Sequence, residues 1–374
     1  MPELRKDVTT NTWVIIASER GKRPHDFTFR ADERVPRACP FCPGHESETP
    51  PEVLALGRPQ GADAPDTPGW EVRVIPNKFP ALAHVALPDQ EGGTAAELGA
   101  AAQSDPVKKE SEAGGAGRAA PAMDVGAVDV GADRLYLHMP GVGAHEVIIE
   151  SPQHDATVGS YTIHHLRLIL QAVLARYQAL SRVPGLRYFQ AFKNFGRIAG
   201  ASLEHAHSQL MVTPMIPPAT EAMIIAGQQY FRAAGNCPLC DLVAEESRLK
   251  RRMVWQSQYF LMFCPYASRF PFETWIVPCL HQPYFGSLAD HAEALTSLAE
   301  AVQYLLQRVE AEFGPVPYNI TLHTAPWEPG HEAYLHWHLR FTPRLTIIAG
   351  FELGTGVYVN PTAPELAAEV LRNS

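Results

Sequence analysis

The stretch FKNFGRIAGASLEHAHSQLMVTP, residues 192–214, decides how the rest of the chain is interpreted. Its last residues favour a β-strand. Side chains two residues apart on a strand point the same way, so we expect His205, His207 and Gln209 to share one face. Three polar side chains on one face of an otherwise apolar strand are hard to explain by packing alone. They indicate a metal ligand, a nucleophile and a phosphate-holding amide, and the alternative is a run of hydrogen-bonded surface residues.

His207 is the candidate nucleophile. If a metal holds His205, the neighbouring strand is rigid, and the His207 imidazole is oriented but free to attack phosphorus near pH 7. Gln209 and Ser202 could donate hydrogen bonds to phosphate oxygens, and Gly200 would let the backbone approach closely. We therefore predict His207, Gln209 and Ser202 as catalytic residues. In isolation, His207 would be interpreted as a hydrogen-bonded core histidine.

Composition narrows the class of protein. The chain has 374 residues, of which 46% are hydrophobic and 19% charged, a profile typical of soluble globular proteins. The net charge of −9 argues against broad nucleic-acid binding. No apolar run approaches the ~20 residues of a membrane span, and the opening MPELRKDVTT lacks the apolar segment of a signal peptide. We expect a cytoplasmic protein with neither nucleic acid nor membrane as a partner.

Four of the six cysteines form two CxxC pairs, CPFC at 39–42 and CPLC at 237–240. Zinc favours four such soft or borderline ligands at tetrahedral corners. The predicted sites are Cys39, Cys42, His154 and His205, and then Cys237, Cys240, His281 and His336. Because protein groups fill all four positions of each site, both zinc ions are predicted to be structural. A redox role for the pairs would need a thioredoxin-like context, which the flanking sequence does not show.

The second half of the chain repeats the order of the first. Each half has a cysteine pair, a histidine after a strand, a long helical pattern, a strand and a His-x-His segment. The two histidines are 205 − 154 = 51 residues apart in the first copy and 336 − 281 = 55 in the second. This repeat predicts two similar α+β units packed into one body, over residues 1–215 and 216–374.

Two segments depart from the repeat. Residues 89–133 are rich in Ala, Gly and charge, which predicts a disordered insertion in the first half. The second copy reads HWHLR at 336–340, so Arg340 stands where Gln209 stood. We therefore predict that only the first copy is catalytic.

The stretches FKNFGRIAGASLEHAHSQ, CPFC and HEVIIESPQH resemble the galactose-1-phosphate uridylyltransferase family, a branch of the histidine-triad superfamily. The resemblance covers nearly the whole chain apart from 89–133. It implies two histidine-triad-like halves, each an antiparallel sheet with helices, and a homodimer. It also implies ping-pong transfer of UMP from UDP-glucose to a hexose 1-phosphate, galactose 1-phosphate, through a nucleotidyl group on His207. The implied nucleotide-sugar and sugar-phosphate contacts are Arg20, Arg23, Asn77, Phe79, Asn194, Gly200 and, for the sugar, Glu352.

The chain departs from the well-known uridylyltransferases, which have HPHGQ where this chain has HAHSQ at 205–209. Its second Cys-His set and its FELGTGVYVNP segment, residues 351–361, also differ. In these respects it is similar to the plant-type members that act as ADP-glucose phosphorylases. One alternative function is therefore an ADP-sugar phosphorylase with inorganic phosphate as acceptor. Another is a zinc-stabilised binding module without catalysis. For Arg20 and Arg23, the alternative to phosphate binding is solvated surface charge.

Overall fold

The computed structural model describes residues 2–18, 39–59, 61, 64–85 and 138–373. The predicted phosphate contacts Arg20 and Arg23 and the predicted insertion at 89–133 lie outside these residues. Among the described residues, no helix combines the length and the apolar composition needed to cross a lipid bilayer.

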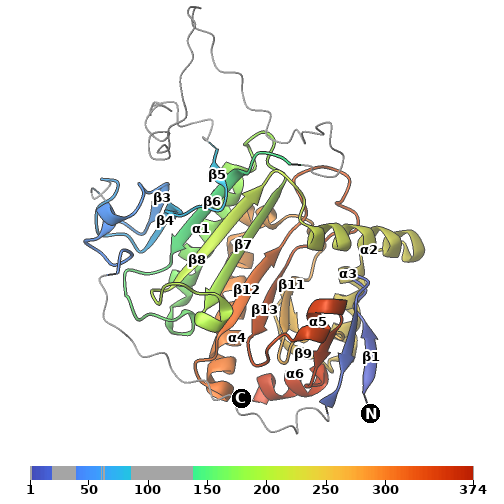
Figure 1. The fold of residues 1–374 in the computed structure, drawn as a ribbon. Helices are drawn as coiled ribbons and strands as arrows, with labels where there is room; N and C mark the ends of the chain where they lie inside the picture. Colours follow the sequence, from blue (N-terminus) through green and yellow to red (C-terminus); the bar gives the residue numbers. More distant parts are fainter. Residues whose placement is uncertain (1, 19–38, 60, 62–63, 86–137, 374) are drawn as a thin grey trace, which may run out of the picture.

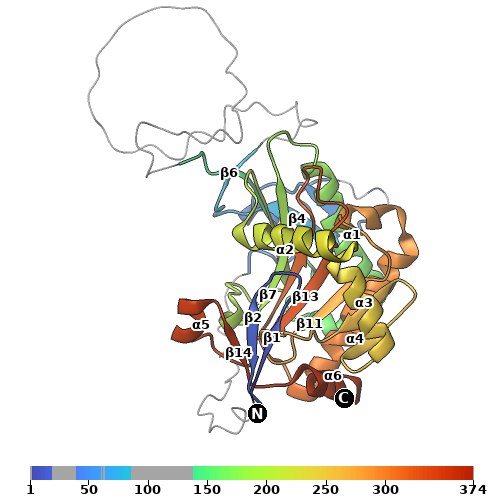
Figure 2. The same ribbon diagram turned by 90° about the vertical axis from the view of Figure 1, so that its right-hand side faces the viewer.

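The described strands form one large sheet and one small one (Figure 1). The large sheet comprises β3 (Leu54–Leu56), β4 (Val72–Pro76), β5 (Ala83–His84), β6 (Val142–Ile149), β7 (Tyr188–Phe195), β8 (His207–Thr213), β9 (Met253–Gln256), β10 (Phe260–Phe263), β11 (Thr274–Pro278), β12 (Tyr318–His323) and β13 (His338–Pro343). The small sheet comprises β1 (Glu3–Lys6), β2 (Trp13–Ile16) and β14 (Tyr358–Asn360), side by side in Figure 2. β14 pairs with β2 in parallel.

The order of the large sheet reflects a duplication. Its strands run β3-β4-β6-β8-β7-β12-β13-β11-β10-β9, with β5 beside β6. Read from either end, each half gives two outer strands, then the strand that precedes a long helix in the sequence, then the two strands that follow this helix, the second of them before the first. The halves meet where β7 pairs antiparallel with β12, Asn194 opposite Asn319. The predicted α+β fold of two similar halves is confirmed. The division between residues 215 and 216 stays a prediction, and it falls between β8 and the next helix.

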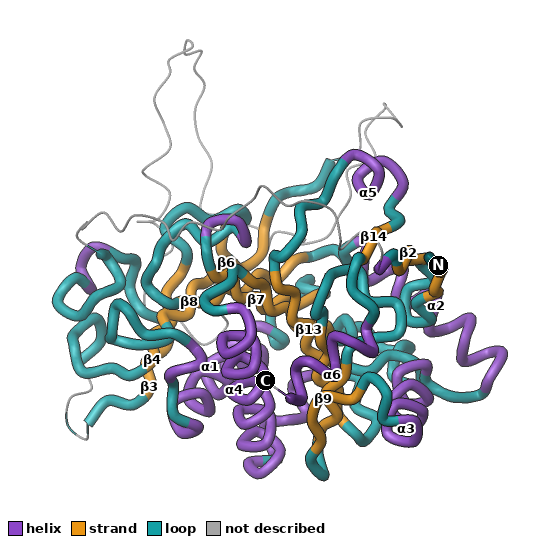
Figure 3. Tube along the Cα trace, turned by 90° about the horizontal axis from the view of Figure 1, so that it is seen from below, coloured by secondary structure: helices purple, strands orange, loops and turns teal. Residues whose placement is uncertain are grey.

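The helices are α1 (Ile163–Leu180), α2 (Pro218–Ala234), α3 (Pro238–Leu249), α4 (Ala292–Phe313), α5 (Gly350–Thr355) and α6 (Pro364–Asn373). α1 and α4 lie next to each other on one face of the large sheet (Figure 3). The main core fills this layer, where Leu210 and Val212 of β8 pack with Leu166 of α1 and Leu298 of α4. His207 and the other odd-numbered residues of β8 therefore face away from the helices.

Local capping sets the start of the first long helix. A 3₁₀ turn at Val158–Ser160 precedes α1, and Thr162 caps α1 by accepting a hydrogen bond from the His165 N–H. Sequence reasoning missed α2 and α3. The second cysteine pair thus opens a helix, with Cys237 at its N-cap, whereas the first pair forms a turn.

Candidate active site and two metal-binding clusters

His207 is the first residue of β8, and only 5% of it is exposed. Its Nδ1 lies 2.8 Å from the carbonyl oxygen of His205. Because a carbonyl can only accept, Nδ1 carries the proton and Nε2 keeps the lone pair of the neutral ring. The ring of Phe41, from the first cysteine turn, contacts it edge-on at a centroid distance of 5.6 Å. The imidazole is thus held in one orientation with Nε2 as its nucleophilic atom.

Burial keeps this ring neutral. Removal from water lowers the pKa of His207, and the nearby Lys193 ammonium lowers it further. The hydrogen bond to His205 opposes this pKa shift in part. The net lowering means that the reactive, unprotonated form dominates at neutral pH.

Gln209 belongs to a short chain of polar side chains on the same face. Its Oε1 lies 2.9 Å from Nε2 of His145 on β6. The Ala81 N–H donates to Nδ1 of that histidine, so Nε2–H donates to Gln209 and leaves the Gln209 NH₂ group for other acceptors. Asn77 adjoins the same ring at 3.1 Å. The structure therefore brings Asn77 and Gln209 together through His145, which sequence reasoning missed. The sequence did contain an indication of His145: it lies two residues before Val147 in the segment HEVIIE, residues 145–150, where side chains alternate between the two faces of the strand.

The glycine-rich turn before β8 is held close to the second half. Asn194, one residue beyond the Lys193–Ser208 pair of β7 and β8, accepts a hydrogen bond from Asn319 at 2.6 Å. Gly200 ends the 3₁₀ turn η4 (Arg197–Ala199) with a φ of 92°, and Ser202 follows, exposed. These predicted substrate-site residues border the strand end that carries His207.

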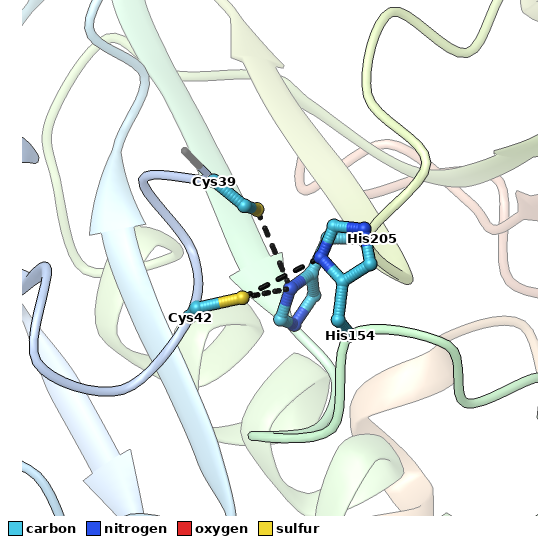
Figure 4. A group of neighbouring side chains, drawn as sticks. All are labelled: Cys39, Cys42, His154 and His205. Atoms are coloured by element: carbon cyan, nitrogen blue, oxygen red, sulfur yellow. Dashed lines mark hydrogen bonds between the residues drawn. The ribbon is translucent and has the colours of Figure 1, made fainter. Parts of the chain in front are cut away.

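The first predicted metal cluster brings four side chains together from three separate segments of the chain (Figure 4). Cys39 Sγ and Cys42 Sγ lie 3.5 and 3.6 Å from His205 Nδ1, and Cys42 Sγ lies 3.4 Å from His154 Nδ1. Sulfur and nitrogen bound to one zinc ion at tetrahedral corners are ~3.6 Å apart. The four side chains therefore fit a tetrahedral ion of that size.

The surroundings of this cluster also fit a metal. His205 Nε2 donates to the Ser151 carbonyl at 2.7 Å, which leaves the Nδ1 lone pair directed at the two sulfurs. Burial and the neighbouring Cys39 raise the pKa of Cys42 to about 11. Without a metal this thiol would stay protonated at neutral pH, so metal binding should release a proton.

The second cluster joins Cys237, Cys240, His281 and His336. Cys240 Sγ lies 3.2 Å from His281 Nδ1 and 3.6 Å from His336 Nδ1, and His281 Nε2 donates to the Glu332 carbonyl at 2.7 Å. His281 is exposed and Nε2 of His336 is buried without a hydrogen-bond partner, so this cluster is more open and less supported than the first.

The C-terminal copy of the nucleophile is blocked. His338 takes the place of His207, and its Nδ1 likewise donates to the carbonyl two residues back, that of His336, at 3.1 Å. The Arg340 Nε–H donates to His338 Nε2 at 2.9 Å and so occupies the lone pair that is free on His207. His323 stacks on the same ring with centroids 4.9 Å apart. His338 therefore has no ring lone pair left free, in contrast to His207.

Two of the predicted substrate contacts, Glu352 and Phe79, form hydrogen bonds with their near neighbours in the sequence. Glu352 lies on α5, which contacts β14 in the C-terminal half (Figure 2), and its carboxylate accepts from the Ala349 N–H at the start of its own helix. Phe79 is 84% exposed, although its N–H donates to the Asn77 side chain. It is a candidate for stacking only if a substrate covers it.

The chain was compared with known proteins and structures. A family model described as a domain of unknown function (DUF4921) matches residues 143–373. The ADP-glucose phosphorylase of Arabidopsis thaliana is 33% identical over 377 residues, covering 99% of this chain and 92% of that protein. The galactose-1-phosphate uridylyltransferase of Thermotoga maritima is 24% identical and covers 100% of this chain and 99% of that protein. The chain belongs to the galactose-1-phosphate uridylyltransferase family.

Solved structures agree with this assignment. The crystal structure of the Arabidopsis thaliana ADP-glucose phosphorylase with bound ADP-glucose has a TM-score of 0.76 at 31% identity, covering 100% of this chain and 99% of that chain. A uridylyltransferase structure has a TM-score of 0.66 at 25% identity and covers 100% of this chain and 98% of that chain. Members of this family therefore share the two-halved fold over their full length.

Proposed function

We propose that this protein is a nucleotidyltransferase that works through a covalent nucleotidyl group on His207. The observation that carries the proposal is the free Nε2 of His207, held by the His205 carbonyl on the same face as Gln209. A non-catalytic binding module would not need a neutral, oriented and uncapped imidazole beside unfilled hydrogen-bond donors.

The reaction has two steps. In the first, the Nε2 lone pair attacks the α-phosphorus of a nucleoside diphosphate sugar, the bond to the bridging oxygen breaks, and the sugar 1-phosphate leaves. In the second, a phosphate oxygen of the acceptor attacks the same phosphorus and the phosphorus–nitrogen bond breaks, returning the lone pair to His207. The Gln209 NH₂ group would donate to the phosphoryl oxygens and stabilise their negative charge.

We propose zinc for both Cys-His clusters, in a structural role. The ion would supply a fixed tetrahedral clamp and no open position for a reactant, because four protein ligands surround it. In the first cluster this clamp would anchor His205, whose carbonyl oxygen orients the His207 ring. Arg20, Arg23, Asn77, Asn194 and Gly200 stay proposed substrate contacts.

For the substrates, we propose ADP-glucose as donor and inorganic phosphate as acceptor, which would yield glucose 1-phosphate and ADP. The 33% identity with an ADP-glucose phosphorylase over 99% of this chain supports this choice. The second candidate is transfer of UMP from UDP-glucose to galactose 1-phosphate, supported by the full-length similarity to galactose-1-phosphate uridylyltransferases.

A labelling experiment separates these donors. Purified protein is incubated without acceptor, once with ADP-glucose and once with UDP-glucose, each labelled in the α-phosphate, and then denatured. We expect an acid-labile, base-stable label from ADP-glucose that is lost when inorganic phosphate is added. Label from UDP-glucose alone would favour the second candidate. Absence of label from both donors, or equal labelling of a His207→Gly variant, would refute the covalent mechanism.

The sugar contact proposed for Glu352 has a structural condition. Because α5 contacts β14 in the C-terminal half, we propose that Glu352 reaches a sugar at His207 from a second copy of the chain. We propose a homodimer on this ground. Sedimentation of the purified protein tests it, and a strictly monomeric but active enzyme would exclude the sugar-binding role of Glu352.

A further inference from the structure

A buried charged group lies on the helix side of β8, directly behind the nucleophile. The Glu150 carboxylate is 2.8 Å from the Lys193 ammonium and accepts the Ser208 hydroxyl at 2.5 Å. Lys193 Nζ also lies 3.3 Å from the carbonyl oxygen of His207. Glu150 and Lys193 are 1% and 6% exposed, so both charges are removed from water.

The backbone around Glu150 extends these contacts along the catalytic segment. The Glu150 N–H donates to the Ala206 carbonyl at 3.1 Å, and the Ser151 carbonyl accepts from the His205 ring at 2.7 Å. Each residue from 205 to 208 is thus contacted by Glu150, Ser151 or Lys193.

A cavity shows that apolar packing does not replace these contacts. Glu150, Lys193 and Ser208 line a space of about 90 Å³ between the sheet and the helices α1 and α4, whose remaining wall is apolar and includes Val173 and Ile320. Protein interiors are otherwise close-packed. Behind Ser208, the position of β8 therefore depends on hydrogen bonds and one ion pair rather than on interlocked side chains.

We propose that Glu150, Lys193 and Ser208 are positioning residues that fix the main chain of His207 for attack on phosphorus. This inference rests on the proposed function. A buried ion pair is a poor source of stability, since desolvation offsets much of its attraction. The ion pair contributes more by holding the backbone of His207 in place, because displacement of a reacting group by about 1 Å can lower the rate on the order of 10²-fold.

The test compares Ser208→Ala with a control, Val173→Ala, which enlarges the same cavity from the α1 side without touching the polar group. Single-turnover labelling by ADP-glucose gives the rate constant of nucleotide transfer, and its concentration dependence gives the dissociation constant. For Ser208→Ala we expect the rate constant to fall by about 10- to 100-fold, with donor affinity and zinc content within about twofold of wild type. Ser208→Thr keeps the hydroxyl and should restore most of the rate.

Val173→Ala should lower the melting temperature while leaving the rate constant at the wild-type value. The proposal is overturned if Ser208→Ala transfers nucleotide at the wild-type rate, or if Val173→Ala slows transfer as much. A Glu150→Gln variant, which keeps the shape of the side chain but removes its charge, should be slowed in the same way as Ser208→Ala.

Hydrogen exchange separates this proposal from the proposed function. Amides of residues 205–209 should exchange faster in Ser208→Ala and Glu150→Gln than in wild type, but not in Val173→Ala. This readout needs no substrate. If no nucleotide sugar labels the wild-type protein, the proposed function fails, and the exchange rates alone decide: unchanged exchange at 205–209 overturns the positioning role.

Discussion

Gly196→Ala is expected to damage the turn that leads to the nucleophile. Gly196 has φ 80° and ψ 151°, a backbone conformation that is essentially restricted to glycine and costs other residues about 1–3 kcal/mol. A Cβ at this position would lie 2.9 Å from Pro317 Cβ and 3.0 Å from its Cγ. The proline ring cannot rotate away, so overpacking adds about 1–3 kcal/mol. The total destabilisation should be about 2–6 kcal/mol.

Gly235→Ala is the matched control. Gly235 ends α2 with φ 74°, and an added Cβ would meet no atom within 4 Å. Only the left-handed backbone penalty applies there, about 1–2 kcal/mol. Urea unfolding of the two variants gives the comparison. Equal destabilisation would refute the argument that the contact with Pro317 constrains the turn. Because the carbonyl of Gly196 accepts from the Ala199 and Ala201 N–H groups, we also expect lower transferase activity from Gly196→Ala but not from Gly235→Ala.

Three further predictions follow from the site and its support. His207→Ala should abolish nucleotide transfer without changing the melting temperature or the zinc content. Cys39→Ser should lower the transfer activity, the melting temperature and the zinc content, since bound structural metal contributes to folding. An equal loss of stability in both variants would mean that His207 has a packing role and no catalytic one. The labelling rate should stay constant as the pH falls through the usual imidazole pKa of about 6.5. Burial lowers the pKa of His207, so its ring keeps the Nε2 lone pair until the pH is lower still. A labelling rate already halved at about pH 6.5 would contradict this prediction. Arg176→Met should cost about 3–5 kcal/mol in calorimetry, since the fully buried Glu146 carboxylate loses its guanidinium partner and keeps only the more distant His84, at 3.6 Å. Arg187→Met at an exposed ion pair should cost at most about 1 kcal/mol.

Sequence reasoning recovered the duplication and the grouping of metal-binding side chains because these have local signatures. Each CxxC turn and each His-x-His segment is visible within five residues, and their repetition in the same order indicates which distant partners meet. The antiparallel meeting of β7 with β12 explains why the two copies form a single sheet. No local pattern indicates that pairing.

The residues that sequence reasoning missed act across strands. His145 lies against both Asn77 and Gln209 because β6 lies between β4 and β8. Glu150 follows the end of β6 and Lys193 lies on β7, 43 residues later, and each alone would be interpreted as surface charge. Glu352 shows the converse: its motif indicated a sugar contact, but its place on α5 depends on the packing of the C-terminal segment.

The small sheet has a consequence for how the chain folds during its synthesis. Its central strand β2 lies near the start of the chain, while its partner β14 comes at residues 358–360. Arg5 of β1 likewise forms an ion pair with Glu365 of the last helix, with 3.0 Å between Nη1 and Oε1. β14 begins 358 − 16 = 342 residues after β2 ends, so during synthesis β2 keeps one edge unpaired until that segment has emerged. A truncation that removes residues 358–360 would leave this edge open to pairing with other chains.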